Sequence, residues 1–153
     1  MKLGRLNHIG VATPSIEESI AYYRDVMGAT KIREPFDLEE QGVKVCFVDT
    51  PGDPTESGPS FGTQIELIEP LSDASPIAGF LAKNPAGGQH HLCYEVEDIE
   101  EARSWFEEKG KRILGPTRIG AHGTPIFFLH PKDMMGQLTE IMETPKETTH
   151  WSN

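Results

Sequence analysis

Apolar side chains recur at helical spacing in two segments of the chain. They are Ile16, Ile20, Tyr23 and Met27 in the first segment, and Ile99, Ala102, Trp105 and Phe106 in the second. This spacing is typical of an amphipathic helix. Ser15 and Asp98 directly precede the segments as candidate N-caps, and Gly28 and Gly110 follow them as candidate stops. The pattern therefore predicts one helix in each segment.

Short apolar runs typical of strands surround both helices. One run begins by Leu6 and another at His90, each ahead of a helix. Three more follow each helix: Thr30–Arg33, Val43–Asp49 and Thr63–Glu69 in the first half, and Arg112–Leu114, Pro125–Leu129 and Gln137–Met142 in the second. Each half thus has the order βαβββ, and a loop with a short helix, Ser75–Lys83, joins them. We predict an α+β fold, a single domain made of two βαβββ modules over about residues 5–70 and 88–144.

The two halves also match residue by residue. NHIGVA in the first half aligns with HHLCYE in the second, so that His8 pairs with His91. The same register pairs Glu66 with Glu140, in the last strand of each half. The first half is longer, and its extra residues fall in Pro51–Gly62, where proline, glycine and serine are typical of a loop. The chain therefore contains a duplicated module with one expanded loop.

Two adjacent histidines start the second half, and only one of them can share a face with the other half's histidine. Successive strand residues point to opposite faces of a sheet. The repeat matches His8 to His91, so we predict that His90 packs or supports the site from outside it. The residues at alternate positions after the matched histidines are small, which leaves volume for a ligand: Gly10, Ala12 and Cys93.

The four matched side chains, His8, Glu66, His91 and Glu140, have the chemistry of a metal site. An inward carboxylate without a partner is costly to bury. Two carboxylates matched by symmetry to two histidines indicate that all four converge on one ion. Imidazole nitrogens and carboxylate oxygens suit a borderline divalent ion, namely Co²⁺, Mn²⁺, Ni²⁺, Zn²⁺ or Fe²⁺. Such a site would keep coordination positions open for water or a chelating substrate.

Charge and composition narrow the class of protein. The 153 residues carry a formal net charge of −10, which disfavours binding to nucleic acid or to an anionic membrane. Cys46 and Cys93 lie in apolar runs and are predicted to be buried thiols rather than a disulfide. No apolar run is long enough to span a membrane, and a strand beginning by Leu6 leaves no room for a signal peptide. We expect a cytoplasmic enzyme, or a trimmed enzyme of the mitochondrial matrix.

Three longer segments carry a family resemblance: EEQGVKVCFV at 39–48, SPIAGFLAKNPAGGQHHLCYEV at 75–96 and IGAHGTPIFFLHPKD at 119–133. With the paired modules, they resemble the vicinal oxygen chelate superfamily, which includes glyoxalase I and the extradiol dioxygenases. Within it, the chain is most similar to the methylmalonyl-CoA epimerase family. The resemblance runs from LNHIGVAT to GQLTEIMETP and implies a cupped mixed sheet built from both modules.

The resemblance also implies an activity and a site. In that family the metal ligands correspond to His8, Glu66, His91 and Glu140, and Co²⁺ is the favoured ion, with Mn²⁺, Ni²⁺ or Zn²⁺ as alternatives. The implied reaction interconverts (2R)- and (2S)-methylmalonyl-CoA through an enolate chelated to the ion, with Glu140 as the catalytic base. The implied partners are an acyl-CoA substrate and a second copy of the chain in a homodimer.

One position departs from the family pattern. Some members carry a second glutamate two residues after the Gly-Val of the EQGV motif, where this chain has Val45. The proton could then be returned by Glu66, by a metal-bound water or by another group. The expanded loop Pro51–Gly62 is a second departure from the family pattern. Either it covers part of the site, or it lies at the edge of the fold without a role in the site.

Further residues are weaker candidates for contact with the substrate. Lys44, Arg118 and Lys132 are possible partners of the CoA phosphates, although each could equally be an ordinary surface cation. Gly120, His122 and Gly123 are expected to shape the mouth of the site, and His130 is interpreted as a structural residue at a strand end.

Three other functions fit the same residues in part. A glyoxalase I-like lyase would use the same four ligands, and only turnover of its substrate would separate it. An extradiol dioxygenase would leave Glu66 without a role. A non-enzymatic small-molecule-binding protein of this fold is the other alternative, but such proteins usually lose the metal ligands that this chain retains.

Overall fold

The computed structural model describes residues 1–52 and 62–146 of the chain. It divides into two compact units: a first unit, His8–His90, and a second unit that combines Met1–Asn7 with the chain from His91 onward. The first seven residues join the second unit because they pair with its strand. The Gly4 amide donates to the Glu95 carbonyl at 2.8 Å, and the Asn7 side chain donates to the Glu95 carboxylate, also at 2.8 Å. That the two halves form a single domain stays a prediction.

The first unit contains the elements of the first module. They are β1 (Leu6–Ala12), α1 (Ile16–Asp25), β2 (Phe36–Leu38), β3 (Val43–Val48), β4 (Gln64–Pro70) and α2 (Ala78–Lys83). The strand order is β2-β3-β4-β1, and β1 runs parallel to β4 while the other neighbours are antiparallel. Pairing the first strand with the last in parallel brings the two polar positions of the module onto neighbouring strands.

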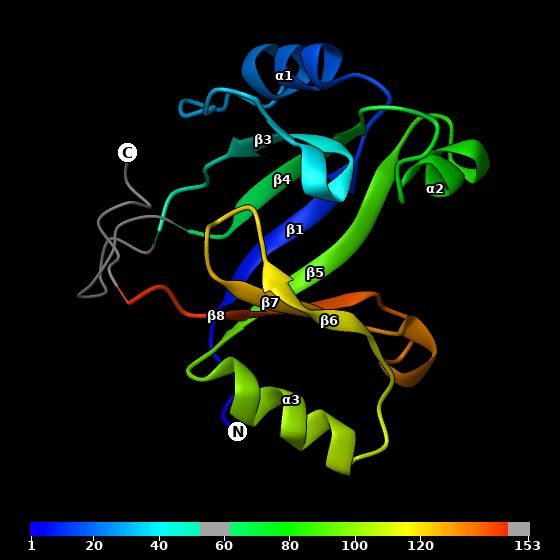
Figure 1. Ribbon diagram of the computed structural model, residues 1–153. Helices are drawn as coiled ribbons and strands as arrows, with labels where there is room; N and C mark the ends of the chain where they lie inside the picture. The colour runs from blue at the N-terminus through cyan, green and yellow to red at the C-terminus, as the bar shows by residue number, and fades with distance from the viewer. Residues whose placement is uncertain (53–61, 147–153) are drawn as a thin grey trace. The chain divides into compact units, whose positions relative to one another are not determined.

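Local sequence explains where α1 begins. Ser15 is the N-cap, and its side chain accepts a hydrogen bond from the Glu18 amide at 3.1 Å. The apolar side of the helix packs on the sheet through Ile16, which shares a buried cluster with Cys46 and Leu67. Figure 1 shows α1 lying across the strands of its own unit. The predicted helix and its cap are confirmed.

The second unit repeats the arrangement. Its elements are β5 (Gly88–Val96), α3 (Ile99–Glu108), β6 (Ile113–Ile119), β7 (Pro125–Leu129) and β8 (Thr139–Glu143), in the strand order β5-β8-β7-β6. Here β5 is parallel to β8, as β1 is to β4. Figure 1 shows α3 alongside the strands of its own unit. Asp98 caps this helix, and the core between helix and sheet includes Phe106 and Phe127 in edge-to-face contact. The order βαβββ is confirmed in each half.

Two predicted boundaries differ from the structure. Thr30–Arg33 is not a strand, since its ladder contact is one isolated bridge, from Ile32 to Val48. Pro35 has no amide proton to continue the ladder, and the strand β2 begins only after it. The predicted short strand Arg112–Leu114 is in fact the start of β6, which continues to Ile119 through a register shift. The short helix expected within the segment Ser75–Lys83 is confirmed as α2.

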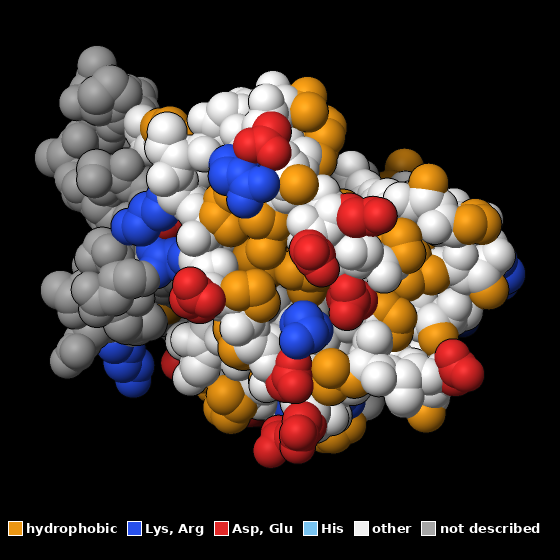
Figure 2. All heavy atoms as spheres, turned by 90° about the horizontal axis from the view of Figure 1, so that it is seen from above, with side chains coloured by type: hydrophobic (Ala, Val, Ile, Leu, Met, Phe, Trp, Pro, Cys, Tyr) orange, Lys and Arg blue, Asp and Glu red, His pale blue; other side chains and the backbone are white. Residues whose placement is uncertain are grey.

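The cysteines, the surface charges and the helix lengths can be compared with the sequence. Cys46 and Cys93 are both free and buried, as predicted, and burial with the nearby Glu34 raises the pKa of the Cys46 thiol to about 11. Acidic and basic side chains are interspersed with apolar ones on the face that Figure 2 shows, without a continuous basic surface among the described residues there. Among the described residues, no helix is long and apolar enough to cross a membrane. The predicted loop Pro51–Gly62 lies mostly outside the described residues.

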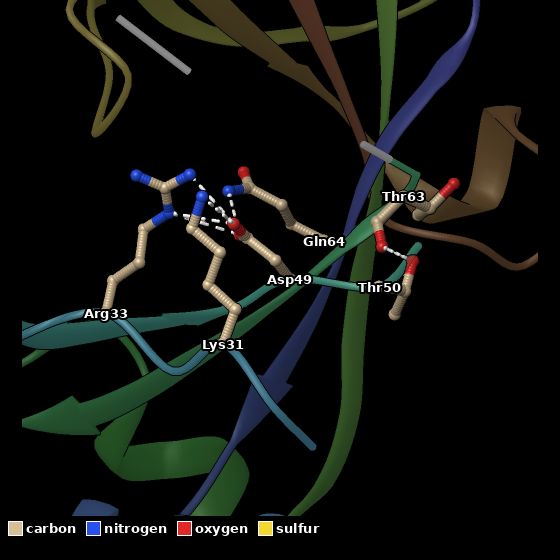
Figure 3. A network of polar contacts seen from close by, with 6 residues as sticks. All are labelled: Lys31, Arg33, Asp49, Thr50, Thr63 and Gln64. Carbon is tan, nitrogen blue, oxygen red and sulfur yellow. Dashed lines mark hydrogen bonds and ion pairs between the residues drawn. The ribbon is translucent and has the colours of Figure 1, made fainter. Parts of the chain in front are cut away.

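A charged network closes one end of the first unit's sheet (Figure 3). Asp49 follows β3, and its carboxylate accepts hydrogen bonds from Nε and Nη2 of the Arg33 guanidinium, the shorter of them at 2.8 Å. Gln64 donates to the same carboxylate at 2.8 Å, and the Lys31 ammonium lies 3.8 Å away. The Asp49 side chain is only 6% exposed, so its charge depends on these partners.

Asp49→Asn should therefore destabilise the protein. The substitution leaves a mostly buried guanidinium without its carboxylate, and we expect a loss of roughly 2 kcal/mol in the free energy of unfolding, measured by urea denaturation. Asp25→Asn is the matched control, because Asp25 pairs with Arg24 at the exposed end of α1 and its loss should leave the midpoint unchanged. An unchanged midpoint for Asp49→Asn would show that the network is not structural.

Candidate functional site

The first unit holds one histidine and one glutamate in contact. His8 lies on β1 and Glu66 on β4, and the parallel register sets Gly10 beside Glu66. The His8 Nε2 atom is 3.5 Å from a carboxylate oxygen of Glu66. Both residues are buried, and Phe47, directly across from Glu66 on β3, meets the His8 ring edge to face. A polar pair is thus enclosed by an apolar wall.

The second unit contains the equivalent pair. His91 lies on β5 and Glu140 on β8, where Glu140 is the register partner of Cys93. The His91 Nε2 atom is 3.1 Å from Oε1 of Glu140, and both residues are buried. Phe128 is directly across from Glu140 on β7, and its ring is edge to face with His91 at 5.4 Å. The aromatic neighbour is repeated along with the pair.

The chemistry of these donors fits a divalent metal ion. Each unit offers an imidazole nitrogen and a carboxylate oxygen that lie close together and are shielded from water. A buried carboxylate needs a cation or donors around it, and nitrogen–oxygen donor sets are typical of borderline divalent ions. A histidine and a glutamate are in contact within each half, and the assembly of all four residues around one ion stays a prediction.

His90 has the different environment that alternation predicts. Its ring lies edge to face against Phe80 of α2, with the ring centres 5.2 Å apart. The neighbouring His91 instead contacts Glu140. The packing role expected for His90 fits this contact.

The cation candidates separate by position. Lys44 lies on the side of β3 that carries Cys46, which packs on α1, and its ammonium is 3.3 Å from Asp37. It therefore faces away from Glu66, and the proposal that it binds substrate is not supported. Lys132 follows β7 at the end opposite the β6–β7 turn. Arg118 is the register partner of Ile126, on the face of the sheet that also carries Glu140.

The β6–β7 turn approaches Glu140 directly. Gly120 is buried, and a Cβ built there would lie 3.7 Å from Oε2 of Glu140. The turn is closed by a hydrogen bond from the Gly120 amide to the Thr124 carbonyl, at 3.0 Å. Gly123 has a φ of 81°, which suits glycine, and His122 is half-buried between them. The predicted mouth residues thus lie on a turn beside Glu140.

Thr124 and His130 flank the two ends of β7. His130 is structural, as expected, because its Nδ1 accepts a hydrogen bond from the Lys132 amide at 3.1 Å. Thr124 was not identified from the sequence. Its hydroxyl oxygen is buried and makes no hydrogen bond to any other described residue. A threonine in a polar turn gives no sequence signal of this kind.

Comparison with known proteins places the chain in a family. Residues 7–128 match the family described as the glyoxalase/bleomycin resistance protein/dioxygenase superfamily. The ethylmalonyl-CoA/methylmalonyl-CoA epimerase of Cereibacter sphaeroides is 50% identical over 141 residues, which cover 91% of this chain and 97% of that protein. The mitochondrial methylmalonyl-CoA epimerase of Homo sapiens is 45% identical, over 91% of this chain and 73% of its own length.

Solved structures agree with these relatives. A variant of the Streptomyces coelicolor methylmalonyl-CoA epimerase, in complex with 2-nitronate-propionyl-CoA, superposes with a TM-score of 0.82 at 30% identity, over 94% of this chain and 99% of that one. A methylmalonyl-CoA epimerase in complex with methylmalonyl-CoA and NH4+ superposes with a TM-score of 0.83 at 31% identity, over 95% of this chain and 97% of that one. The expected fold is confirmed. With its repeated His–Glu pairs, the chain belongs to the methylmalonyl-CoA epimerases of the glyoxalase/bleomycin resistance protein/dioxygenase superfamily.

Proposed function

We propose that this protein is a metal-dependent epimerase that interconverts (2R)- and (2S)-methylmalonyl-CoA. The observation that carries the proposal is the repeated buried contact, His8 with Glu66 and His91 with Glu140, in a chain of the methylmalonyl-CoA epimerase family. A binding protein without catalysis would have no need for two carboxylates at these matched positions. The substrate would be an acyl-CoA, as in the epimerase structure that contains methylmalonyl-CoA.

The four side chains His8, Glu66, His91 and Glu140 would hold the ion. Family resemblance favours Co²⁺, with Mn²⁺, Ni²⁺ or Zn²⁺ as alternatives. When bound, the ion supplies Lewis-acid stabilisation of the negative charge that develops on the thioester oxygen. The aromatic rings beside each pair, Phe47 and Phe128, keep water from the donors.

Glu140 would remove the proton at C2. Its Oε1 is 3.1 Å from Nε2 of His91, and a Cβ built at Gly120 would lie 3.7 Å from its Oε2. Inversion at C2 also requires that a proton be returned to the opposite face. Val45 is buried on β3 and has no acidic group, so the family's second glutamate has no equivalent at this position. In the first unit, Glu66 is the buried carboxyl group that could supply the proton.

A second substrate follows from one relative. The Cereibacter sphaeroides protein is named for ethylmalonyl-CoA as well as methylmalonyl-CoA. The two thioesters differ by one methylene on C2, and the same proton transfer would epimerise both. We propose both as substrates. On family resemblance we also propose a homodimer in the cytoplasm.

Exchange of the C2 proton is the direct test of the activity. In D₂O the purified, metal-loaded protein should replace the C2 hydrogen of methylmalonyl-CoA with deuterium, followed by NMR. A chelator that removes the ion should stop the exchange, and added Co²⁺ should restore it. Absence of exchange at full metal occupancy would contradict the proposal, and a glutathione hemithioacetal assay would then test the lyase alternative.

Glu140→Gln should reduce the exchange rate by a factor of at least about 100, since the amide cannot accept the proton. Circular dichroism should show an unchanged fold. Glu107→Gln, on the exposed side of α3, is the matched control and should keep the full rate. A Glu140→Gln protein that exchanges at a near-normal rate would remove this residue from the role of base.

His91→Asn and His90→Asn form a matched pair of neighbouring substitutions. The first should lower both the bound metal, measured by elemental analysis, and the exchange rate. The second should leave the metal content close to the wild-type value, because His90 packs against Phe80. Equal losses of metal in the two variants would refute the assignment of His91 as the ligand.

A further inference from the structure

Gln64 lies beside His8 on the face of the sheet that carries the candidate donors of the first unit. It is the register partner of His8 across the parallel strands β4 and β1, and it precedes Glu66 by two residues. Side chains at alternate strand positions share a face. Gln64 therefore shares a face with Glu66, which contacts His8, whereas Leu67 packs against α1 from the opposite face.

Asp49 extends the same row of side chains at the end of β3. The antiparallel register of β3 and β4 pairs Phe47 with Glu66, and its continuation by two residues sets Asp49 opposite Gln64. The Gln64 amide nitrogen donates a hydrogen bond to the Asp49 carboxylate at 2.8 Å. Asp49, Gln64 and His8 thus form one polar row across three neighbouring segments of the sheet.

The contact with Asp49 determines how the Gln64 amide is oriented. Gln64 is only 4% exposed, and the Asp49 side chain is also buried. A carboxylate accepts hydrogen bonds and cannot donate them, so the nitrogen end of the amide must face Asp49. Figure 3 shows Arg33 and Lys31 in contact with the same carboxylate, which keeps its negative charge balanced. A buried ionic network therefore holds the side chain that stands next to His8.

The second unit forms the equivalent pair of strands without this polar row. The alignment of the two halves places Leu138 where the first half has Gln64. The strands β5 and β8 nevertheless pair in parallel, as β1 and β4 do. A buried amide costs free energy unless it is hydrogen-bonded, and a leucine avoids that cost. The fold therefore does not require an amide at position 64, and what distinguishes this position is its place between Asp49 and His8.

We infer that Gln64, held by Asp49, is a positioning residue that orients His8 for metal binding. This inference rests on the proposed function, in which His8 is a metal ligand. Histidine ligands depend on neighbouring side chains that hold the ring in one orientation, and the loss of such a neighbour typically weakens metal binding by a factor of about 10 to 100.

The test measures the dissociation constant of Co²⁺ by calorimetry on the full chain, after a chelator has removed bound metal. Gln64→Met keeps a similar side-chain volume but removes the amide, and it should weaken Co²⁺ binding about tenfold. Gln137→Met, in the exposed turn before β8, is the matched control and should bind Co²⁺ as the wild type does. At saturating Co²⁺, Gln64→Met should exchange the C2 proton of methylmalonyl-CoA at close to the wild-type rate, because Gln64 does not contact the substrate in this assignment.

Asp49→Asn tests whether Gln64 acts through the network. It should also weaken Co²⁺ binding, measured on protein that circular dichroism shows to be folded. The double variant should lose no more affinity than Gln64→Met alone, because the two side chains act in series. Losses that add in the double variant would contradict the role of Asp49 in holding Gln64.

Each outcome decides the question. A folded Gln64→Met protein with the wild-type dissociation constant overturns the inference and leaves the epimerase activity in place. An exchange rate that stays low at full metal occupancy also overturns it, since Gln64 would then act on the substrate. If Gln64→Met does not fold, Asp49→Asn decides, and unchanged Co²⁺ binding overturns the inference. A wild-type protein that neither binds Co²⁺ nor exchanges the C2 proton overturns the proposed function, and the inference with it.

Discussion

Burial of carboxylates is the constraint on which the rest of this structure depends. Glu66 and Glu140 are each removed from water, and an ionised carboxylate in such a place is unfavourable unless a donor or a cation lies beside it. In each unit one imidazole contacts the carboxylate, His8 for Glu66 and His91 for Glu140. An imidazole nitrogen and a carboxylate oxygen together form a donor set that is typical of divalent ions. The arrangement therefore makes physical sense as a site that binds a cation, and less sense as a packed core.

The topology of the sheet brings the histidine and the glutamate of each half together. In each half the first strand runs parallel to the last, so that a histidine on one and a glutamate on the other share a face. The opposite face is apolar and packs on a helix, α1 or α3. Because the pattern is set by strand pairing, it survives differences in loop length between the halves. Duplication of one module thus produces two pairs that each consist of a histidine and a glutamate.

Periodic features were predictable from the sequence, and local exceptions were not. The helices, their caps at Ser15 and Asp98, and the choice of His91 over His90 all follow from spacing and repeat register. The strand predicted at Thr30–Arg33 was wrong. The apolar pattern of those residues cannot reveal that Pro35 lacks the amide proton needed for strand pairing, so that the strand begins only after it.

Side-chain environments were harder to predict than elements. The direction of Lys44 depends on the register of β3, which places it beside Asp37 instead of Glu66. The position of Gly120 near Glu140, twenty residues away in the chain, depends on how β7 pairs with β8. A glycine in a turn has the same sequence signature whether it serves the backbone or leaves space for a ligand.

The two halves have also diverged in what surrounds each carboxylate. Glu66 is opposite Phe47, and Val45, two residues before Phe47 on the same face, is also apolar. Glu140 has the corresponding ring, Phe128, across from it, and the buried Gly120 lies on the β6–β7 turn near one of its oxygens. The proposed base, Glu140, is thus the carboxylate that lies near a glycine of a turn, whereas Glu66 faces a strand with large apolar side chains.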